Sequence, residues 1–393
     1  MVIKCDVLVV GAGPAGLSTA ITTSKLGLKT VLIEKSSELG YPVKTSALTW
    51  KTVIDEWGVS EKSIAQWYDK FKIVSFHSKK NVTVPFKDYV CCTLNFLTFL
   101  KELSLKSMNS KTHFLINKKV RDFTIKDEKE VTVELDDGKN IKSKIIVDAS
   151  GLNAIIAKKL DLIPKHFELG IGIEYELSNA KVRNLDQFDI FVGHEEVIPI
   201  GYGWSFPVGK DKTRVGVATS IVTGKDKKIN IEYYLNKFIS RDSPIYPITK
   251  DSQKMEVHTG AYPVGGFFKK TYTNNVLVVG DAAGHANPLF GEGIRYALDF
   301  GKIAGSVAFD AVSKGDFSEE FLSSYQSKCE SQIKDYYNVI LKTSEIPTDT
   351  FWDMLIDALK YLKDAKKEDL IIKILRNEVS MKEAEEIFEF KTQ

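Results

Sequence analysis

The sequence lacks the features that would place the protein in a membrane or in an oxidising compartment. Its 393 residues include only four cysteines, none with CxxC spacing, which excludes a disulfide framework and favours a reducing compartment. No run of about 18 apolar residues occurs, so no membrane-spanning helix is expected. Asp6 interrupts the N-terminal apolar run, and no signal-like cleavage region follows it. We therefore expect a cytoplasmic protein.

A strong excess of one charge is also missing. The chain has 54 Lys and Arg against 52 Asp and Glu, a net charge of +2, so we expect no nucleic-acid partner. No Cys/His cluster has metal-ligand spacing and no GxSxG motif occurs, so neither a metal site nor an acyl-transfer triad is predicted. The length and the hydrophobic content of 43% instead favour a globular chain of two or three domains.

The N-terminal segment has the pattern of a β-α-β unit. The apolar run 7–10 predicts a buried strand, and a turn rich in glycine follows at 11–16. Helical spacing of apolar residues comes next, and residues 30–33 predict a second buried strand that ends at Glu34. A strand, a glycine-rich turn, a helix and a terminal acid in this order are typical of dinucleotide binding.

Each glycine of this turn has a separate expected role. Gly11 makes the tight turn, Gly13 lets the backbone approach a pyrophosphate, and Gly16 lets the helix pack on the strand. The free N–H groups of the helix N-terminus then face the phosphates, and Glu34 stands where a carboxylate binds ribose hydroxyls. This pattern by itself does not separate NAD from FAD.

Two later segments add nucleotide signals. Residues 145–151 predict another buried strand that closes on a turn of small residues. Residues 275–284 predict a strand that delivers Asp281 at its carboxyl end, the edge at which open α/β sheets bind ligands. Gly291 and Gly293 then open a long predicted helix, whose N-terminal dipole stabilises negative charge on a reduced flavin.

Together these three segments resemble the FAD-binding signature of the para-hydroxybenzoate hydroxylase-like flavoproteins. The resemblance implies FAD held in a discontinuous domain with an inserted substrate domain. It places Asp281 at the ribityl and phosphate region, and Gly293 and Ile294 against the isoalloxazine. The expected cofactor-binding residues are Gly11, Gly13, Ala15, Gly16, Glu34, Lys35, Lys44, Thr45, Ala47, Val120, Gly151, Asp281, Gly291, Gly293 and Ile294.

One branch of these flavoproteins is favoured by further motifs. Residues 199–207, PIGYGWSFP, match the PxxYxWxFP motif of geranylgeranyl reductases, and residues 262–266 are similar to the Gly-Gly segment of that family. Aromatic hydroxylases usually carry His directly after GDAA, whereas this chain has Gly284 there. The resemblance covers roughly residues 1–340. It implies Tyr202, Trp204, Phe206, Gly265 and Gly266 as substrate residues.

The alternation of Tyr202, Trp204 and Phe206 predicts a strand with three aromatic rings on one face. Two interpretations stay open, an ordinary packing face and the wall of a long apolar channel for an isoprenoid chain. Neighbouring strands of the inserted sheet are predicted at 170–177, 188–193, 214–219 and 255–264.

The chain departs from the geranylgeranyl reductase pattern at two positions. Thr45 replaces the Cys expected near the flavin, and Thr93 stands where an Arg is expected near the start of a helix. Cys91 and Cys92 are either buried, inert thiols or a substitute catalytic thiol. His285 is either a proton donor beside the flavin or a helix-entry histidine bonded to backbone. Catalysis is thus unassigned, with Thr45 and His285 as candidates.

The C-terminal region is predicted to be helical, with helices at 351–362 and 370–375 and from Ser380, which forms a capping box with Glu383. Residues 351–359 are bulky and apolar, and they either pack against the FAD domain or form a lid or an interfacial contact. The lysines that follow face either anionic head groups or solvent: Lys360, Lys363, Lys366 and Lys367.

The predicted fold class is α/β, α+β overall, with a Rossmann-like FAD-binding domain, an inserted mixed β-sheet domain and a helical C-terminus. The FAD-binding domain comprises residues 1–70, 94–165 and 270–320, and the substrate domain comprises 71–93 and 166–269. Residues 321–393 form the C-terminal helical region.

The predicted function is FAD-dependent saturation of C=C bonds of geranylgeranyl chains, on digeranylgeranylglycerophospholipid or geranylgeranyl diphosphate, by hydride transfer. The alternatives are an FAD-dependent monooxygenase of a small aromatic or polycyclic substrate and a noncatalytic flavin- or lipid-binding protein. The electron donor, whether NADPH, ferredoxin or another reductant, stays open. Membrane contact is expected to be peripheral at most.

Overall fold

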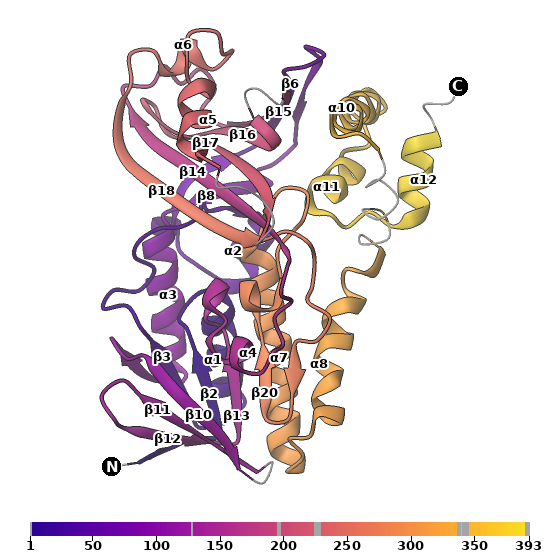
Figure 1. Cartoon of the computed structure of the whole chain (residues 1–393). Coiled ribbons are helices and arrows are strands. Elements are labelled where there is room, and N and C mark those ends of the chain that lie inside the picture. The colour runs from indigo at the N-terminus through magenta and orange to yellow at the C-terminus, as the bar shows by residue number, and fades with distance from the viewer. Residues whose placement is uncertain are drawn as a thin grey trace.

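The computed structural model (Figure 1) describes residues 2–126, 129–194, 198–223, 229–335, 339 and 346–389. Its strands form two large sheets and two small ones, and helices pack on the large sheets and fill the C-terminal region. The expected mixed α/β class is confirmed. None of the helices in the described ranges combines the length and the apolar character that a bilayer crossing requires.

The first large sheet contains the predicted nucleotide strands. Four of its neighbouring pairs are parallel, and the register brings the carboxyl ends of these strands to one edge. The central strands are fully apolar because both faces of the sheet are covered, one by helices and the other mainly by strands at 130–135 and 140–143 and by a short helix at 155–159. In order across the sheet the strands are β19 (Tyr272–Thr273), β20 (Val276–Val278), β13 (Ile145–Asp148), β2 (Val7–Val10), β3 (Thr30–Glu34) and β9 (His113–Ile116).

Helices α1 (Pro14–Lys25) and α7 (Ile294–Lys314) pack closely against each other on this sheet. A Cβ built on Gly301 of α7 would lie 2.4 Å from the carbonyl oxygen of Ala15, so only glycine permits this approach. Helix α3 (Phe96–Asn109) packs beside α1. The close crossing fixes the N-termini of α1 and α7 near the same sheet edge.

The second large sheet is mixed and carries the aromatic motif. Its strands are, in order, β18 (Gln253–Pro263), β14 (Glu168–Ser178), β17 (Lys212–Val222), β16 (Ile198–Gly209), β15 (Gln187–His194), β6 (Lys70–Ser75) and β7 (Asn81–Pro85). The four strands predicted around the aromatic motif therefore exist as β14, β15, β17 and β18. Helix α5 (Ile231–Phe238) covers the outer face of this sheet.

Two small sheets and three short helices complete this part of the described chain. A four-stranded sheet joins β1 (Ile3–Lys4), β12 (Asn140–Ser143), β11 (Glu130–Leu135) and β10 (Val120–Lys126), and a three-stranded sheet joins β4 (Leu48–Trp50), β8 (Cys91–Leu94) and β5 (Ile64–Tyr68). The remaining helices of this part are α2 (Lys51–Trp57), α4 (Ile155–Lys159) and α6 (Tyr246–Thr249).

Thr93 corrects one sequence expectation. It lies in strand β8, whereas helix α3 begins only at Phe96 with Asn95 as its capping residue. The Thr93 hydroxyl bonds to the Tyr68 hydroxyl at 2.8 Å, and its side chain is buried. A buried threonine in a β-ladder supports the sheet and offers no group at a helix N-terminus.

The C-terminal helices exist as predicted, and the first of them packs mainly on the second large sheet. Helix α8 (Glu319–Ser331) lies along α7, and α10 (Thr348–Asp364) lies over β6, β7 and β15 rather than on the first large sheet (Figure 1). Helices α11 (Glu368–Arg376) and α12 (Met381–Glu389) follow, and Ser380 forms the expected capping box with Glu383. The apolar face of α10 covers mainly the second sheet, and Trp352 also packs against Phe290 of the segment 270–320, with ring centroids 6.0 Å apart.

Candidate functional site

A pocket lies at the carboxyl ends of β2, β3 and β13. We call it the nucleotide pocket, and six of the expected cofactor residues line it: Gly11, Gly13, Glu34, Lys35, Val120 and Gly151. These residues come from segments far apart in the chain, and the parallel register of the sheet collects them at one edge. The arrangement matches the position at which open α/β sheets bind nucleotides.

The glycines of the first turn serve two different purposes. A Cβ on Gly11, which has φ +109°, would lie 2.3 Å from the Ala149 carbonyl oxygen, and one on Gly16 would lie 1.9 Å from that of Gly11. The fold itself therefore requires glycine at both positions. A Cβ on Gly13 meets no protein atom within 4 Å. The space at Gly13 suits a pyrophosphate at the N-terminus of α1, so these residues fit the expected dinucleotide.

Glu34 lies at the end of β3 and holds this turn in place. Its carboxylate accepts the Ala12 N–H at 2.9 Å through Oε2 and the Ser36 N–H at 2.8 Å through Oε1. A carboxylate has about four acceptor sites, so two remain for the hydroxyls of a ribose. Glu34 therefore combines a structural bond with free acceptor capacity at the edge of the nucleotide pocket.

Asp281 directly follows β20 and faces the N-terminus of α7. Its Oδ1 atom lies 3.9 Å from the position of a Cβ built on Gly293. Burial raises the pKa of the Asp281 carboxyl to about 6. Within the described part of the chain no donor bonds to this carboxylate. A ligand hydroxyl would supply the missing bond, which fits the expected ribityl chain.

We predict that Asp281→Asn stabilises the cofactor-free protein above about pH 6, the raised pKa of the carboxyl. The unfolded chain ionises this group near the ordinary value of about 4, so between the two values the folded protein progressively loses stability as pH rises. Thermal unfolding at a series of pH values checks this. The gain should vanish below about pH 4, where both side chains are neutral, and a gain that is constant with pH would contradict the assignment.

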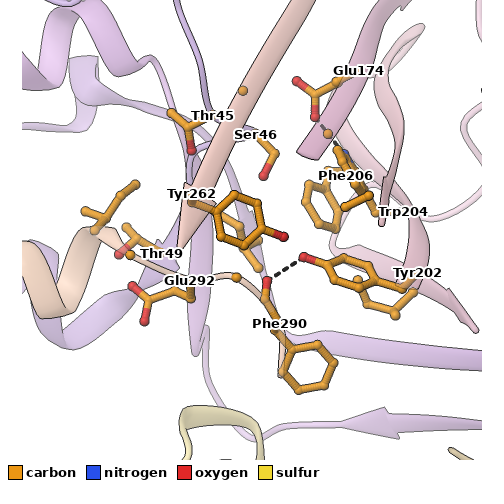
Figure 2. Close-up of a pocket in the computed structure, with 18 of the residues that line it drawn as sticks. Thr45, Ser46, Thr49, Glu174, Tyr202, Trp204, Phe206, Tyr262, Phe290 and Glu292 are labelled. Atoms are coloured by element: carbon orange, nitrogen blue, oxygen red, sulfur yellow. Dashed lines mark hydrogen bonds between the residues drawn. The ribbon is translucent and has the colours of Figure 1, made fainter. Parts of the chain in front are cut away.

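A larger cavity lies between the two large sheets (Figure 2). It encloses about 1080 Å³ of empty space, part of it open to solvent, and we call it the aromatic cavity. The expected cofactor residues Lys44, Thr45, Gly291, Gly293 and Ile294 line one side, and the expected substrate residues Tyr202, Trp204 and Phe206 line another. The expected binding position of the flavin ring therefore lies in the same cavity as the aromatic side chains of the strand.

The three aromatic rings form a continuous wall. The ring centroids of Tyr202 and Trp204 are 5.8 Å apart, and those of Trp204 and Phe206 are 6.1 Å apart. On the neighbouring strand a Cβ on Gly216 would lie 2.1 Å from the Trp204 ring, so glycine lets the indole lie flat on the sheet. The Tyr202 hydroxyl donates to the Phe290 carbonyl oxygen. Of the two open interpretations, the geometry favours the wall of an apolar channel.

Several expected residues do not reach either space. Gly265 and Gly266 lie outside the aromatic cavity, where the Gly266 carbonyl oxygen would be 2.6 Å from a Cβ on Gly284 and so supports the turn after β20. Other residues lie behind the lining or beside it: Ala15, Gly16, Ala47 and Asp281. Ala15, Gly16 and Ala47 belong to the turns that carry the lining residues, whereas the Asp281 carboxylate lies next to the lining residue Gly293.

Of the two candidates for catalysis, Thr45 lines the aromatic cavity and His285 does not. The Thr45 hydroxyl accepts the Ala47 N–H at 3.0 Å, so it shapes the loop that lines the aromatic cavity. His285 lies outside the cavity, and its Nδ1 accepts the Gly280 N–H at 3.2 Å. Burial lowers the pKa of His285 to about 3, so the imidazole is neutral and cannot act as the proton donor at neutral pH.

Cys91 and Cys92 are fully buried in strand β8 and lie outside the residues that line the aromatic cavity. Burial raises the pKa of both thiols above the ordinary value. Neither thiol therefore supplies the thiolate that a substitute catalytic cysteine would need. Of the two interpretations left open by the sequence, the geometry favours buried, inert thiols.

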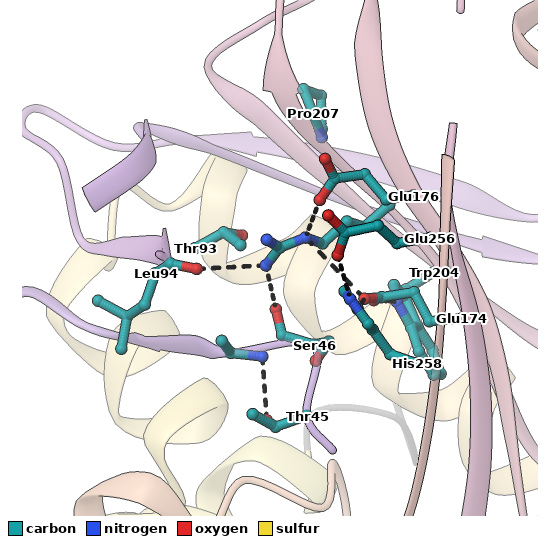
Figure 3. Close-up of polar contacts among 12 residues, drawn as sticks. Thr45, Ser46, Thr93, Leu94, Glu174, Glu176, Trp204, Pro207, Glu256 and His258 are labelled. Atoms are coloured by element: carbon teal, nitrogen blue, oxygen red, sulfur yellow. Dashed lines mark hydrogen bonds and ion pairs between the residues drawn. The ribbon is translucent and has the colours of Figure 1, made fainter. Parts of the chain in front are cut away.

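The sequence analysis missed a polar network at the aromatic cavity (Figure 3). Glu174 accepts the Trp204 indole N–H at 2.6 Å, and its other oxygen lies 3.0 Å from Nδ1 of His258. Arg214 donates to Glu176 at 3.0 Å and also to the Ser46 carbonyl oxygen at 3.3 Å. Two acids that alternate with apolar residues in predicted strand 170–177, Glu174 and Glu176, were the available signal.

Known proteins resemble the chain over most of its length. The family model for the lycopene cyclase protein matches residues 6–337. The digeranylgeranylglycerophospholipid reductase of Methanococcus vannielii is 35% identical over 330 residues, 82% of this chain and 81% of that protein. The protein of the same name from Methanocaldococcus jannaschii is 34% identical over 365 residues, 90% of each chain.

Solved structures share the fold. A geranylgeranyl bacteriochlorophyll reductase-like protein from Thermoplasma acidophilum superposes with a TM-score of 0.83 at 24% identity, over 91% of this chain and 92% of that chain. The flavin-dependent brominase Bmp2 superposes with a TM-score of 0.76 at 18% identity, over 95% and 94% of the two chains. These likenesses show a shared fold, and a fold by itself does not specify a reaction.

Proposed function

Because the chain belongs to the family of digeranylgeranylglycerophospholipid reductases, we propose that it saturates carbon–carbon double bonds of geranylgeranyl chains on isoprenoid lipids. The observation that carries this proposal is the aromatic cavity, which opens onto the expected seat of the flavin ring. The cavity lining is largely apolar, as a polyisoprenoid chain requires.

The cofactor is FAD, and the expected residues divide its parts among themselves. Gly13 and the N-terminus of α1 hold the pyrophosphate, and Glu34 holds a ribose. Asp281 holds the ribityl chain. The loop 44–46 and the segment 291–294 would line the ring. When bound and reduced, FAD supplies a hydride to one carbon of the double bond.

The protein positions the substrate double bond and excludes water from it. An isolated alkene polarises poorly, so the rate depends strongly on holding each double bond at the reacting distance. The rings of Tyr202, Trp204 and Phe206 guide the chain along the cavity without hydrogen bonds, and Phe71 and Phe188 extend the apolar lining. Excluded water and oxygen leave the hydride no competing acceptor.

The remaining partners are an electron donor and a membrane surface. We propose NADPH, ferredoxin or another carrier as the reductant of the flavin. We also propose a peripheral contact with the membrane, in which Lys360 and Lys363 at the end of α10 face anionic head groups. Such a contact would bring the lipid to the cavity, beside which α10 and α11 lie.

We expect the purified protein to be yellow and to convert a geranylgeranyl lipid when its flavin is reduced with dithionite under anaerobic conditions. Mass spectrometry should show a gain of about two mass units for each saturated bond. The control is oxidised protein incubated with the lipid without dithionite. It should leave the lipid unchanged. In a parallel assay in air, oxygen consumption with a mass gain of oxygen would instead indicate a monooxygenase. A flavin that never turns over with lipid would indicate a noncatalytic binding protein.

A further inference from the structure

A chain of ionisable groups leads from solvent into the aromatic cavity. Glu256 is 57% exposed, and its Oε2 atom lies 2.8 Å from Nε2 of His258. His258 is 7% exposed, and its Nδ1 atom lies 3.0 Å from Oε1 of Glu174, which is 3% exposed. Both His258 and Glu174 line the cavity. Three groups thus connect bulk water with the cavity through two hydrogen bonds (Figure 3).

Strand pairing holds this chain of groups in place. Glu174 on β14 stands directly opposite His258 on β18, and Glu176 stands opposite Glu256. Opposite residues of an antiparallel pair lie close together on the same face. Two residues further along β18, a Cβ on Gly260 would lie 2.2 Å from the Lys44 carbonyl oxygen. The strand that carries His258 therefore runs directly against the loop expected to line the flavin.

The charges around His258 favour its protonated form. The hydrogen bond to Glu174 is the largest contribution that raises the His258 pKa, and Glu256 raises it further, whereas burial and Arg214 lower it. Arg214 comes from β17 and is itself paired with Glu176 at 3.0 Å. Lys44 from the facing loop is another cation at the cavity. The net effect holds the pKa above its ordinary value, so the imidazolium persists toward neutral pH.

Saturation of an alkene needs a proton as well as a hydride, and the other candidates are poorly suited to deliver it. Thr45 carries an unactivated hydroxyl, and burial raises the pKa of Tyr262 to about 12. Glu292 also lines the cavity and burial raises the pKa of its carboxyl, but its contacts among the described residues lead only to Arg295, whose backbone N–H lies 2.8 Å from Oε1 and whose guanidinium lies 3.7 Å from Oε2. Among the described lining residues, Glu174 and His258 form an acid with a route to solvent.

We propose that Glu256, His258 and Glu174 form the proton relay of the reaction, with Glu174 releasing the proton into the cavity and His258 recharging Glu174 from solvent. This inference rests on the proposed function. As the hydride adds to one alkene carbon with both electrons, a proton passes from Nδ1 of the His258 imidazolium through the Glu174 carboxylate to the other carbon, so that an N–H bond breaks and a C–H bond forms. His258 is left neutral with its remaining proton on Nε2, beside Glu256, and one proton taken up from solvent restores the imidazolium.

Glu256→Gln tests the relay at an exposed position that does not line the cavity. Loss of this carboxylate should lower the His258 pKa. NMR titration of labelled histidine in the holoenzyme measures that pKa without any turnover, and His258→Gln identifies the signal among the six histidines. The pH–rate profile of lipid reduction by prereduced enzyme should fall as pH rises through the same pKa. It should shift by the same amount as the NMR titration in Glu256→Gln.

His258→Gln should lower the rate of lipid reduction by roughly 100-fold and remove this step from the pH profile, while the FAD content stays that of the wild type. His113→Gln, at an exposed position on β9, is the matched control and should change neither. The relay is overturned if the His258 pKa moves in Glu256→Gln but the rate profile does not, or if Glu292→Gln abolishes turnover while His258→Gln does not. Failure of the wild-type enzyme to reduce any lipid would instead overturn the proposed function.

Discussion

Gly13→Ala should give a folded protein that binds little FAD. A Cβ at this position meets no protein atom within 4 Å, so the fold should tolerate the methyl group. The same methyl group would enter the space assigned to the pyrophosphate. Overpacking typically costs about 1–3 kcal/mol, which corresponds to a rise in the Kd for FAD of roughly tenfold to a hundredfold. Absorbance of bound flavin per chain and thermal unfolding of the cofactor-free protein measure the two effects separately.

Two other glycines provide controls for this result. Gly209→Ala lies in the hairpin between β16 and β17, and its Cβ would make only an ordinary contact of 3.5 Å with Lys212, so FAD content should not change. Gly16→Ala should instead destabilise the fold, because its Cβ would lie 1.9 Å from the Gly11 carbonyl oxygen. Wild-type FAD affinity in folded Gly13→Ala would show that the pyrophosphate does not occupy this space.

Trp204→Ala should lower lipid reduction strongly while FAD content stays intact. The substitution removes the central ring of the aromatic wall and the donor that holds Glu174 at 2.6 Å. Misplacement of the alkene by about 1 Å is enough to lower a rate by roughly 100-fold. Turnover of prereduced protein with a geranylgeranyl lipid and the flavin absorbance together measure this effect. Loss of FAD instead would show that this strand supports the cofactor rather than the substrate.

Trp204→Phe separates the ring from its hydrogen bond. The Phe ring retains most of the apolar wall, but Glu174 loses a charge-assisted bond, which should destabilise folding by about 1.5–3 kcal/mol. Trp352→Phe on α10 is the matched control, because this buried indole N–H has no hydrogen-bond partner among the described residues. We expect that variant to be neutral or slightly more stable in urea unfolding. Equal destabilisation of the two variants would contradict a role for the Glu174 bond.

Local patterns were sufficient for most of the secondary structure and for much of the nucleotide pocket. The β-α-β unit occupies consecutive residues, and its glycine spacing reflects contacts within that unit, such as the one between Gly16 and Gly11. Period-two alternation likewise placed Tyr202, Trp204 and Phe206 on one face of β16. These features depend on the geometry of a single element or of two consecutive elements, so they can be read without knowledge of distant contacts.

Long-range packing accounts for what the sequence could not supply. Amphipathic spacing predicted α10 but not its partner, because an apolar stripe does not specify which sheet it covers. The sequence around His285 and His258 does not distinguish their environments. In the structure His285 lies among aromatic rings, whereas His258 lies between two carboxylates. His258 and Glu174 are 84 residues apart in the chain and meet only through the register of β14 and β18. Protonation depends on such neighbours, so the acid of the cavity became visible only when the strands were paired.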